Sequence, residues 1–315
     1  MDIDQQIARL ERELSRLKVQ KAEQEGTAAF PRPLEGIRVI DLSRFLAGPF
    51  CTQMLADMGA EVIKVEPREG GDPVRRGGSR ALRGESLFFL ARNRNKKSLA
   101  VDLKKAAGKE IIHKLVQTAN VFVENFRPGA ADGMGLGYEA LSRLNPRLLY
   151  CSISGYGPDG PYRDKPGQDL LIQGVSGIIS LTGWEGGPPT TVGTFVADML
   201  GAFHAAYGIA IALVARERLG LGQKINISLL DSLLALQSVE ATTYLNTGVL
   251  PKKAGHGHSL VPPPYQVFDT QGGAITVSAP LEEWWQRLCQ VSDFRDLVDD
   301  PRFASRESRL ENGEV

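Results

Sequence analysis

The sequence predicts an α/β protein with a doubly wound, mainly parallel sheet of Rossmann type and a smaller α+β domain. Short, continuously apolar runs alternate with helical patterns between residues 37 and 154. Polar, glycine-rich segments follow the apolar runs, as expected of loops at strand ends. After Pro262-Pro263-Pro264 the pattern changes to a hairpin followed by a helix, which predicts the smaller domain.

The elements of the sheet follow one another along the first half of the chain. Residues 37–42 (IRVIDL) and 61–65 (EVIKV) have the apolar continuity of buried parallel strands, with a helix over 49–58 between them. Ligands of such sheets bind outside the carboxyl ends of the strands, so the loops after the strands are expected to form the site. Further strands are predicted over 98–103, 121–123 and 148–154, and a further helix over 106–116.

Composition indicates a soluble cytoplasmic protein. The chain has 315 residues, 42% of them hydrophobic and 23% charged, which is enough apolar surface for a core. Its 37 basic and 37 acidic residues cancel, so no global field attracts nucleic acid or a membrane surface. Three scattered cysteines, Cys51, Cys151 and Cys289, predict a reducing compartment without disulfides. With four histidines and no ligand spacing, no metal site is expected, nor is a membrane span.

Four segments are expected along the chain. Residues 1–30 form an amphipathic helix and a linker; the helix lies on its own domain or pairs with another subunit, and both readings stay open. Residues 31–250 form the large α/β domain, and residues 251–263 form a linker with a glycine- and histidine-containing loop. Residues 264–315 form an incomplete small α+β domain.

Asp198 lies where a β-branched approach, residues 190–196, gives way to an apolar helix that is expected to run to about residue 215. An ionised carboxylate among apolar neighbours costs several kcal/mol unless it is paired or solvated. One explanation is that Asp198 is the N-cap of the helix. The other is a nucleophile held ionised at a helix start by the helix dipole. The residues of this stretch alone favour the cap.

Residues 75–97 are basic although the whole chain is neutral. Glu85 is the only acid among eight basic residues. This segment is either a solvated surface or part of a pocket for a compact polyanion, because guanidinium groups match phosphate geometry. The eight residues are Arg75, Arg76, Arg80, Arg83, Arg92, Arg94, Lys96 and Lys97.

Seven segments in order resemble the class III CoA-transferase family (CaiB/BaiF), the group that contains formyl-CoA transferase. The first 30 residues lie outside this resemblance. The segments are PLEGIRVIDLSRFLAGPFCTQMLADMGAEVIKVEP (33–67), NRNKKSLAVDL (93–103), VFVENFRPG (121–129), GQDLLIQGVSG (167–177), GPPTTVGTFVAD (187–198), GLGQKINISLLD (220–231) and PYQVF (264–268).

The resemblance implies an enzyme, an acyl-CoA:carboxylate CoA-transferase with Asp198 as its covalent nucleophile. Family members form an aspartyl anhydride and then an aspartyl-CoA thioester, which a free carboxylic acid resolves. The resemblance also implies that coenzyme A is bound by the large domain and that the chain forms an interlocked homodimer. Family chains continue past this point, so the C-terminal segment that returns to the large domain is expected to be absent here.

Carried over residue by residue, the resemblance assigns the binding site. Leu46 is apolar where formyl-CoA transferase has a glutamine, which implies an acyl group less polar than formyl or oxalyl. Gly257 and His258 fall where the family has a mobile glycine loop over the active site. Gln168 and Asp169 fall near the acyl group. The residues expected to contact CoA are Arg44, Phe45, Ala47, Arg68, Lys97, Asn125, Phe126 and Arg127.

Two alternatives remain open. Racemases of 2-methylacyl-CoA share the fold and move a proton between a histidine and an aspartate; the corresponding residues here are Gln168 and Asp169, and glutamine cannot carry a proton. Asp169 is then either a polar group near the acyl chain or a helix N-cap. A catalytically inactive CoA-binding subunit is the second alternative. The sequence leaves the acyl group and the acceptor acid undetermined.

Overall fold

The protein is described by a computed structural model that covers most of the chain. The described residues are 32–77, 80–291 and 294–313, together with Glu13, Arg16, Leu17, Gln20 and Lys21. The amphipathic helix expected over residues 1–25 lies almost wholly outside the described residues. Its pairing with another subunit therefore stays a prediction.

Contacts divide the chain into two compact units. The first consists of Met1–Ser154 and Ala202–Ile227, and the second of Gly155–Gly201 and Ser228–Val315. This division differs from the boundaries expected at residues 250 and 264, because parts of the expected large domain group with the second unit. The assignment of separate functions to the four expected segments stays a prediction.

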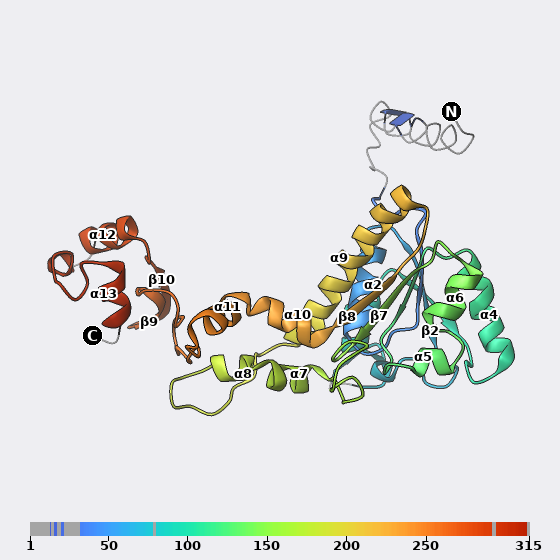
Figure 1. The fold of residues 1–315 in the computed structure, drawn as a ribbon, viewed down its shortest axis with the longest axis horizontal. Helices are drawn as coiled ribbons and strands as arrows, with labels where there is room; N and C mark the ends of the chain where they lie inside the picture. Colours follow the sequence, from blue (N-terminus) through green and yellow to red (C-terminus); the bar gives the residue numbers. More distant parts are fainter. Residues whose placement is uncertain are drawn as a thin grey trace. The chain divides into compact units, whose positions relative to one another are not determined.

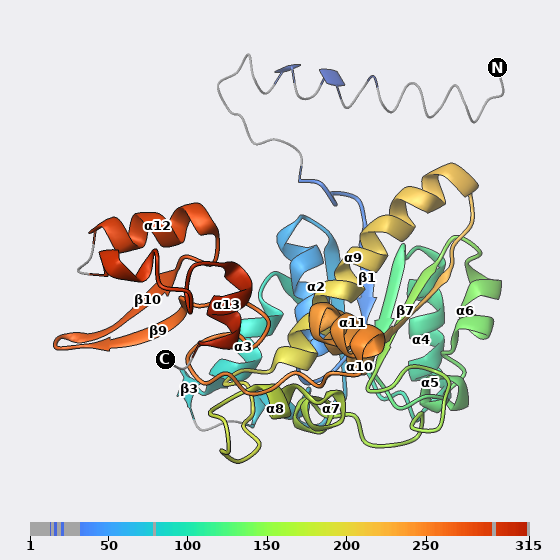
Figure 2. The same cartoon turned by 60° about the vertical axis from the view of Figure 1, so that its left-hand side comes forward.

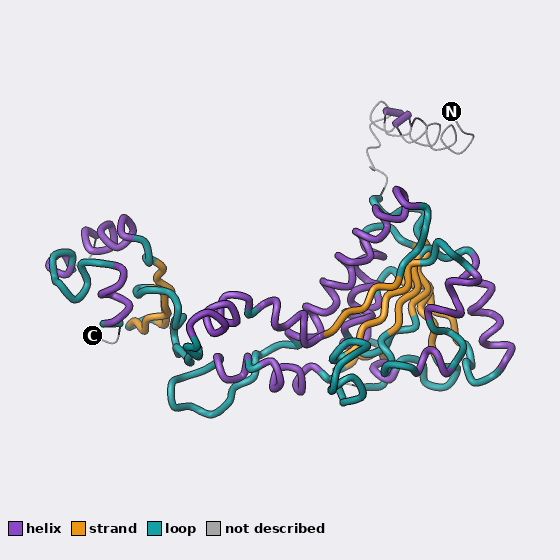
Figure 3. The backbone as a smooth tube through the Cα atoms, in the orientation of Figure 1, coloured by secondary structure: helices purple, strands orange, loops and turns teal. Residues whose placement is uncertain are grey.

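The first unit is built on a six-stranded sheet in the order β5-β2-β1-β6-β7-β8, seen as neighbouring strands in Figure 3. Strand β1 pairs in parallel with β2 and β6, β2 with β5, and β6 with β7. Chain order runs outward from β1 and β6, so the topological switch lies between these two strands. The strands are β1 (Arg38–Asp41), β2 (Glu61–Glu66), β5 (Lys96–Ala100), β6 (Val121–Glu124), β7 (Leu149–Ser154) and β8 (Lys224–Ser228).

Apolar runs form the central strands because both faces of the sheet are covered. Val39 of β1 pairs with Val62 and Val121, and all three side chains are at most 1% exposed. The edge strand β5 begins at Lys96, two residues before the expected start. An edge strand tolerates charged residues because one side is open to water, and an apolar pattern therefore misses its first residues.

Helices cover both faces of this sheet (Figures 1 and 2). On one face, α2 meets the part of α9 that belongs to the first unit, where the rings of Phe50 and Phe203 pack edge to face. On the other face, Ile112 of α4 and Leu141 of α6 are fully buried in a cluster with Phe122 of β6. The predicted doubly wound architecture is thereby confirmed. The helices and short elements of this unit are α2 (Ala47–Asp57), η1 (Pro73–Arg75), β3 (Ala81–Leu82), β4 (Glu85–Ser86), α3 (Leu87–Asn93), α4 (Ala106–Gln117), α5 (Ala130–Gly133) and α6 (Tyr138–Leu144).

Helix α9 (Val196–Leu219) begins in the second unit and ends in the first. Ala202, Ala205 and Ile209 are fully buried on its sheet-facing side. By length and composition it is the one helix among the described residues that could cross a membrane, and 39% of its most apolar stretch is buried within the protein. Core helices of soluble proteins pass the same test, so this is weak support for a membrane span.

The second unit combines helices with an antiparallel hairpin. A Cβ at Gly201 would lie 2.2 Å from a methyl carbon of Leu229, so only glycine allows the start of α9 to approach α10 this closely. The hairpin and the helix carrying Trp284 and Trp285 confirm the predicted small α+β elements. The elements are α7 (Asp169–Ser176), α8 (Ile178–Leu181), α10 (Leu229–Leu236), α11 (Ser238–Thr247), β9 (Tyr265–Thr270), β10 (Gly273–Ser278), α12 (Glu282–Val291), η2 (Arg295–Leu297) and α13 (Arg306–Glu311).

Candidate functional site

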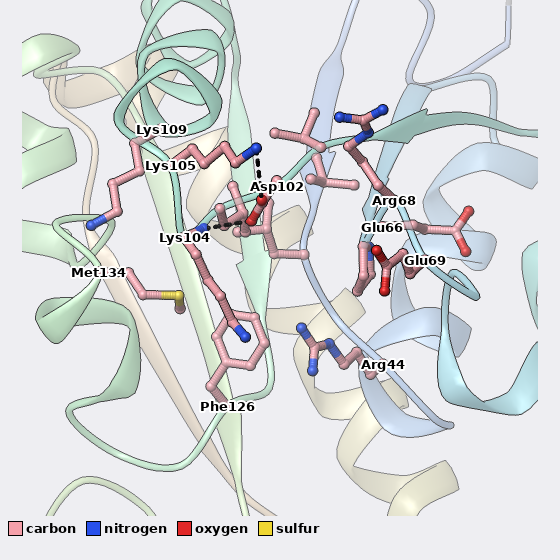
Figure 4. Close-up of a pocket in the computed structure, with 15 residues that line it drawn as sticks. Arg44, Glu66, Arg68, Glu69, Asp102, Lys104, Lys105, Lys109, Phe126 and Met134 are labelled. Atoms are coloured by element: carbon pink, nitrogen blue, oxygen red, sulfur yellow. Dashed lines mark hydrogen bonds and ion pairs between the residues drawn. The ribbon is translucent and has the colours of Figure 1, made fainter.

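A pocket of about 910 Å³ opens at the carboxyl ends of strands β1, β2, β5 and β6 in the first unit (Figure 4). It lies at the topological switch of the sheet, where doubly wound folds bind ligands. Its volume is at the upper end of the range for small-molecule sites. The lining residues are Leu42, Arg44, Val65, Glu66, Pro67, Arg68, Glu69, Val101, Asp102, Leu103, Lys104, Lys105, Lys109, Phe126 and Met134.

Basic side chains dominate the polar lining of this pocket. Figure 4 shows Arg44 and Arg68 on one side of the pocket and Lys105 and Lys109 on the other. Asp102 engages its own neighbours, since it accepts a hydrogen bond of 3.0 Å from the N–H of Lys104 and its carboxylate lies 4.0 Å from the Lys105 ammonium. A wall of guanidinium and ammonium groups suits a ligand that carries phosphates.

A buried carboxylate anchors the loop between β1 and α2, which carries Arg44. Asp41 Oδ1 accepts hydrogen bonds from the N–H and the hydroxyl of Ser43 at 2.9 and 2.5 Å, and Oδ2 lies 3.1 Å from Lys96 Nζ. Burial alone would raise the pKa of Asp41, but the charges of Lys96 and Lys64 and these hydrogen bonds outweigh burial and lower it. The loop is thus fixed by fully buried, compensated charges.

Lys64 extends this network toward the loop after β2. Its ammonium donates to the carbonyl of Ser43 at 2.9 Å and pairs with Asp72 Oδ2 at 2.9 Å, and Lys64 and Asp72 are at most 2% exposed. The loop that carries Arg44 and the loop that carries Arg68 are therefore tied to the same buried lysine.

Glu66 lines the pocket at the end of β2, yet its carboxylate is fully engaged. It accepts two hydrogen bonds from Arg75 at 2.7 and 2.8 Å, one from the Ser98 hydroxyl and one from the N–H of Asp72. Burial alone would raise the pKa of Glu66, but these bonds outweigh burial and lower it to about 2. Glu66 therefore stays ionised, and its charge is offset by Arg75.

Asn125 holds Arg44 from the loop after β6. Its Oδ1 accepts from the N–H of Arg44 and its Nδ2 donates to the carbonyl of Arg44, both at 2.8 Å. The Arg44 guanidinium lies over the ring of Phe126, 5.2 Å from the ring centre. The Asn125 side chain thus acts on the protein backbone, and the neighbouring Arg44 and Phe126 face the pocket.

The pocket includes three of the eight residues expected to contact CoA, namely Arg44, Arg68 and Phe126. Sequence reasoning missed Lys104, Lys105 and Lys109, although the first two lie in the loop after β5, which is the available signal. None of the eight basic residues between positions 75 and 97 lines this pocket. The expected contacts that lie outside it are Phe45, Ala47, Lys97, Asn125 and Arg127.

Lys97 illustrates why the basic segment of residues 75–97 does not line the pocket. It sits at the amino-terminal part of β5, 72% exposed, and its ammonium pairs with Glu61 Oε1 at 2.7 Å. Arg94 pairs with Asp57, and Arg75 with Glu66 and Glu85. Asp57, Glu61 and Glu66 lie outside residues 75–97. A count of charge within that segment therefore does not reveal that they pair with several of its basic residues.

Leu46 is 1% exposed and belongs to the core of the first unit. Its side chain does not line the pocket, so the acyl preference inferred from it stays a prediction.

Asp198 lies in the first turn of α9, within the second unit. The helix begins at Val196, two residues earlier than Asp198, so Asp198 is not the residue that precedes the helix. Its side chain is neither fully buried nor fully exposed. The N-cap position expected for Asp198 is therefore corrected to a position inside the first turn.

Asp169 supplies the cap from another helix. It is the first residue of α7, and its Oδ1 accepts hydrogen bonds from the N–H groups of Ala197 and Asp198 at 2.8 and 3.1 Å. Gln173, one turn along α7, donates to Asp169 Oδ2 at 2.6 Å. Asp169 thus caps α9, whereas the sequence pattern suggested a cap on its own helix. Gln168 precedes α7 and is exposed.

The loop carrying Gly257 and His258 also lies in the second unit. His258 Nε2 lies 3.1 Å from Glu240 Oε1, and the N–H of Leu260 donates to His258 Nδ1 at 3.2 Å. Because Nδ1 accepts a hydrogen bond, the ring proton belongs on Nε2, which donates to Glu240. A role of Gly257 or His258 near the substrate stays a prediction.

In the part of the chain that the structure describes, no group of three or more His, Cys, Asp or Glu side chains is arranged to hold a metal ion.

Sequence comparison finds relatives over nearly the whole chain. The model of CoA-transferase family III matches residues 34–314. The chain is 40% identical to succinyl-CoA–D-citramalate CoA-transferase of Chloroflexus aurantiacus, over 90% of this chain and 70% of that protein. It is 41% identical to succinate–glutarate CoA-transferase of Agrobacterium fabrum, over 88% of this chain and 71% of that protein. Of the human succinyl-CoA:glutarate CoA-transferase, at 39% identity, the chain spans 64%.

Solved structures agree with the sequence relatives. A CaiB/BaiF family protein from Brucella suis superimposes with a TM-score of 0.79 at 36% identity, over 90% of this chain and 76% of that chain. A protein from Mycobacterium tuberculosis superimposes with a TM-score of 0.80 at 35% identity, over 90% and 75%. The family model, the sequence relatives and the solved structures agree, and the chain belongs to CoA-transferase family III.

Proposed function

We propose that the protein is an acyl-CoA:carboxylate CoA-transferase in which Asp198 is the covalent nucleophile. Membership of CoA-transferase family III supports the reaction class. The position of Asp198 in the first turn of α9 supports the nucleophile, because the positive end of a helix favours an ionised carboxylate. This placement is the observation that carries the proposal.

The proposed reaction exchanges CoA between two acids through Asp198. A carboxylate oxygen of Asp198 attacks the thioester carbonyl carbon; the C–S bond breaks, leaving CoA thiolate and a mixed anhydride. The thiolate attacks the aspartyl carbonyl, which releases the donor acid and forms an aspartyl-CoA thioester. The acceptor carboxylate then attacks this thioester, and the thiolate attacks the acyl carbonyl of the second anhydride. A new acyl-CoA leaves and Asp198 is free again.

The pocket of the first unit is the proposed site of the phosphate-bearing part of CoA. Arg44, Arg68 and Lys104 combine two planar guanidinium groups with a flexible ammonium, which suits a pyrophosphate and a ribose phosphate. Glu66, at the strand end where dinucleotide sites often bind a ribose hydroxyl, is already engaged by Arg75. A phosphorylated ribose therefore fits this pocket better than a free one.

Trapping the covalent intermediate tests the nucleophile. The protein is incubated with succinyl-CoA, quenched with hydroxylamine or borohydride, digested and mapped by mass spectrometry. Modification is expected on Asp198 and is expected to vanish in Asp198→Ala, together with turnover. Label on another residue, or unchanged turnover in Asp198→Ala, would overturn the proposal.

A racemase would exchange the α-proton of 2-methylacyl-CoA with solvent, whereas the proposed transferase would not. Gln168 stands where a racemase needs a protonatable group, so we expect no exchange of α-protons with D₂O in 2-methylacyl-CoA. An inactive CoA-binding subunit would bind CoA without any acyl exchange, and its CoA binding would survive Asp198→Ala.

We propose a short dicarboxylate donor, because the relatives from Chloroflexus aurantiacus and Agrobacterium fabrum are named for succinyl or succinate transfer. A panel of succinyl-, glutaryl-, acetyl- and oxalyl-CoA, each with succinate or glutarate as acceptor, tests this choice. Faster turnover of a monocarboxylic donor would contradict it.

We also propose that the chain forms an interlocked homodimer and is located in the cytoplasm. The side of α9 away from the sheet exposes Phe203, Tyr207, Ile211 and Val214, an apolar stripe at helical spacing. Light scattering of the purified protein distinguishes a dimer from a monomer.

Three buried free cysteines are consistent with a reducing compartment, which localisation of a tagged chain would test.

A further inference from the structure

Glu124, the last residue of β6, is a buried carboxylate beside the pocket of the first unit. It is 4% exposed and does not line the pocket itself. We propose that Glu124 is a positioning residue of the CoA site, which holds the ring of Phe126 in place beneath the guanidinium of Arg44. This role depends on the proposed binding of CoA in the pocket and is independent of which residue is the nucleophile.

The Glu124 carboxylate joins the turn after β6 to strand β7. Its Oε2 accepts a hydrogen bond of 2.7 Å from the N–H of Phe126, two residues further along the chain. Its Oε1 accepts a longer hydrogen bond of 3.4 Å from the hydroxyl of Tyr150. Tyr150 is 2% exposed, and its ring stacks on that of Phe122 with the ring centres 5.2 Å apart. The acceptor of the Phe126 N–H is therefore anchored in the core of the first unit.

Phe126 transmits this constraint to Arg44. Both residues line the pocket, and the guanidinium lies 5.2 Å from the centre of the Phe126 ring (Figure 4). A guanidinium is attracted to the negative face of an aromatic ring, and this contact orients its planar set of donors. Asn125 fixes the main chain of Arg44, whereas Glu124, through Phe126, fixes the direction of the Arg44 side chain.

The buried carboxylate of Glu124 has a cost for the fold. Burial is the largest influence on the pKa of Glu124 and raises it, in spite of the hydrogen bonds that the carboxylate accepts. Glu66, at the end of β2, is also buried, but Arg75 pairs with it and its pKa is lowered. Acids with perturbed pKa values cluster at functional sites, which favours a role of Glu124 in binding.

Glu124→Met tests the inference, because methionine fills a similar volume but has no carboxylate to accept from the N–H of Phe126. The Kd for CoA is measured on the folded protein by isothermal titration calorimetry. We expect it to rise by about five- to tenfold, which is the scale of a partly desolvated cation–π contact. Glu124→Gln keeps an oxygen that can accept from the same N–H, so its Kd should stay within about twofold of the wild-type value.

A double-mutant cycle shows whether Glu124 acts through Phe126. In Phe126→Leu the ring beneath Arg44 is already absent, so the further change Glu124→Met should alter the Kd by less than about twofold. If the two changes instead raise the Kd independently, so that their effects multiply, Glu124 does not act through Phe126 and the inference is overturned.

Hydrogen exchange of the Phe126 amide in the wild-type protein is an independent measurement, and it decides the matter if Glu124→Met does not fold. A positioning role requires the hydrogen bond to exist before the ligand arrives. We therefore expect this amide to be protected in the protein without CoA. Protection that develops only after CoA is added would overturn the inference.

Asn145→Ala is the matched control, because Asn145 Oδ1 accepts from the N–H of Arg147, also two residues along the chain, at 3.1 Å and outside the pocket. Its Kd for CoA should equal that of the wild type. A wild-type Kd in folded Glu124→Met, or an equal rise in Asn145→Ala or Glu124→Gln, would overturn the inference. A wild-type Kd in both Arg44→Ala and Phe126→Leu would instead overturn the proposed CoA site, so the two failures are distinguishable.

Discussion

Asn125 and Arg44 exchange two hydrogen bonds of 2.8 Å although they are 81 positions apart in the chain. The amide of Asn125 matches the main-chain N–H and carbonyl of Arg44 as a complementary strand would. The loop after β6 thereby determines where the loop after β1 stands, and with it the guanidinium over Phe126.

Asn125→Ala should weaken CoA binding although Asn125 does not line the pocket. Both hydrogen bonds to Arg44 are lost, so we expect the Kd for CoA to rise about tenfold, measured by isothermal titration calorimetry. Asn145→Ala is the control, since Asn145 donates to the carbonyls of Val116 and Ala119 in the same unit, outside the pocket. An unchanged Kd in Asn125→Ala would show that Arg44 needs no such support.

Lys104→Ala should weaken CoA binding far more than Lys97→Ala. Lys104 lines the pocket, and a charged hydrogen bond to phosphate is typically worth about a factor of ten or more. Lys97 is occupied by Glu61 at the surface, so its removal should change the Kd less than about twofold. The comparison is repeated with dephospho-CoA. A larger loss in Lys97→Ala would move the binding site away from this pocket.

Glu66→Gln should reduce stability in a pH-dependent manner. The folded pKa of Glu66 is about 2, below an unfolded value of about 4.3, so its contribution is complete above pH ~4.3 and is lost as the pH falls toward 2. We expect a difference of about 3 kcal/mol in unfolding free energy at pH 7, which narrows by pH 3. Urea denaturation at both pH values measures it. A difference in unfolding free energy between wild type and Glu66→Gln that stays constant between the two pH values would contradict the prediction.

Asp41→Asn should destabilise the first unit strongly. It leaves the buried ammonium of Lys96 without its carboxylate, a change that costs roughly 3–5 kcal/mol in buried ion pairs. Asp57→Asn breaks the more exposed pair with Arg94 and should cost about 1 kcal/mol or less. Circular dichroism during urea denaturation compares the two. Equal losses would mean that the Asp41 network contributes no more than a surface pair.

The central sheet could be predicted from sequence because its strands are buried on both faces. The run IRVIDL places Val39 and Ile40 among fully buried residues, so its apolar continuity reflects packing directly. The predicted start of the edge strand β5 was two residues too late. Lys96 and Lys97 suit an edge strand but do not fit an apolar pattern.

The candidate site could be predicted in part. Arg44, Arg68 and Phe126 follow strand ends within segments that resemble the family, and they line the pocket. Interactions between distant segments could not be predicted from the sequence. No local pattern shows that Glu61 pairs with Lys97, or that Asn125 hydrogen-bonds to the backbone of Arg44. Pairing across the fold, and not residue type, decides which basic groups remain available to a ligand.

The cap that Asp169 places on α9 restricts how the start of this helix could be transplanted. A segment of residues 190–219 moved into another scaffold would carry Asp198 but leave behind the carboxylate that accepts from its N–H, 29 positions upstream. A designer would have to move α7 and α9 together, with Gln173 between them, to reproduce the geometry. The smallest portable form of this capped first turn is therefore a pair of helices.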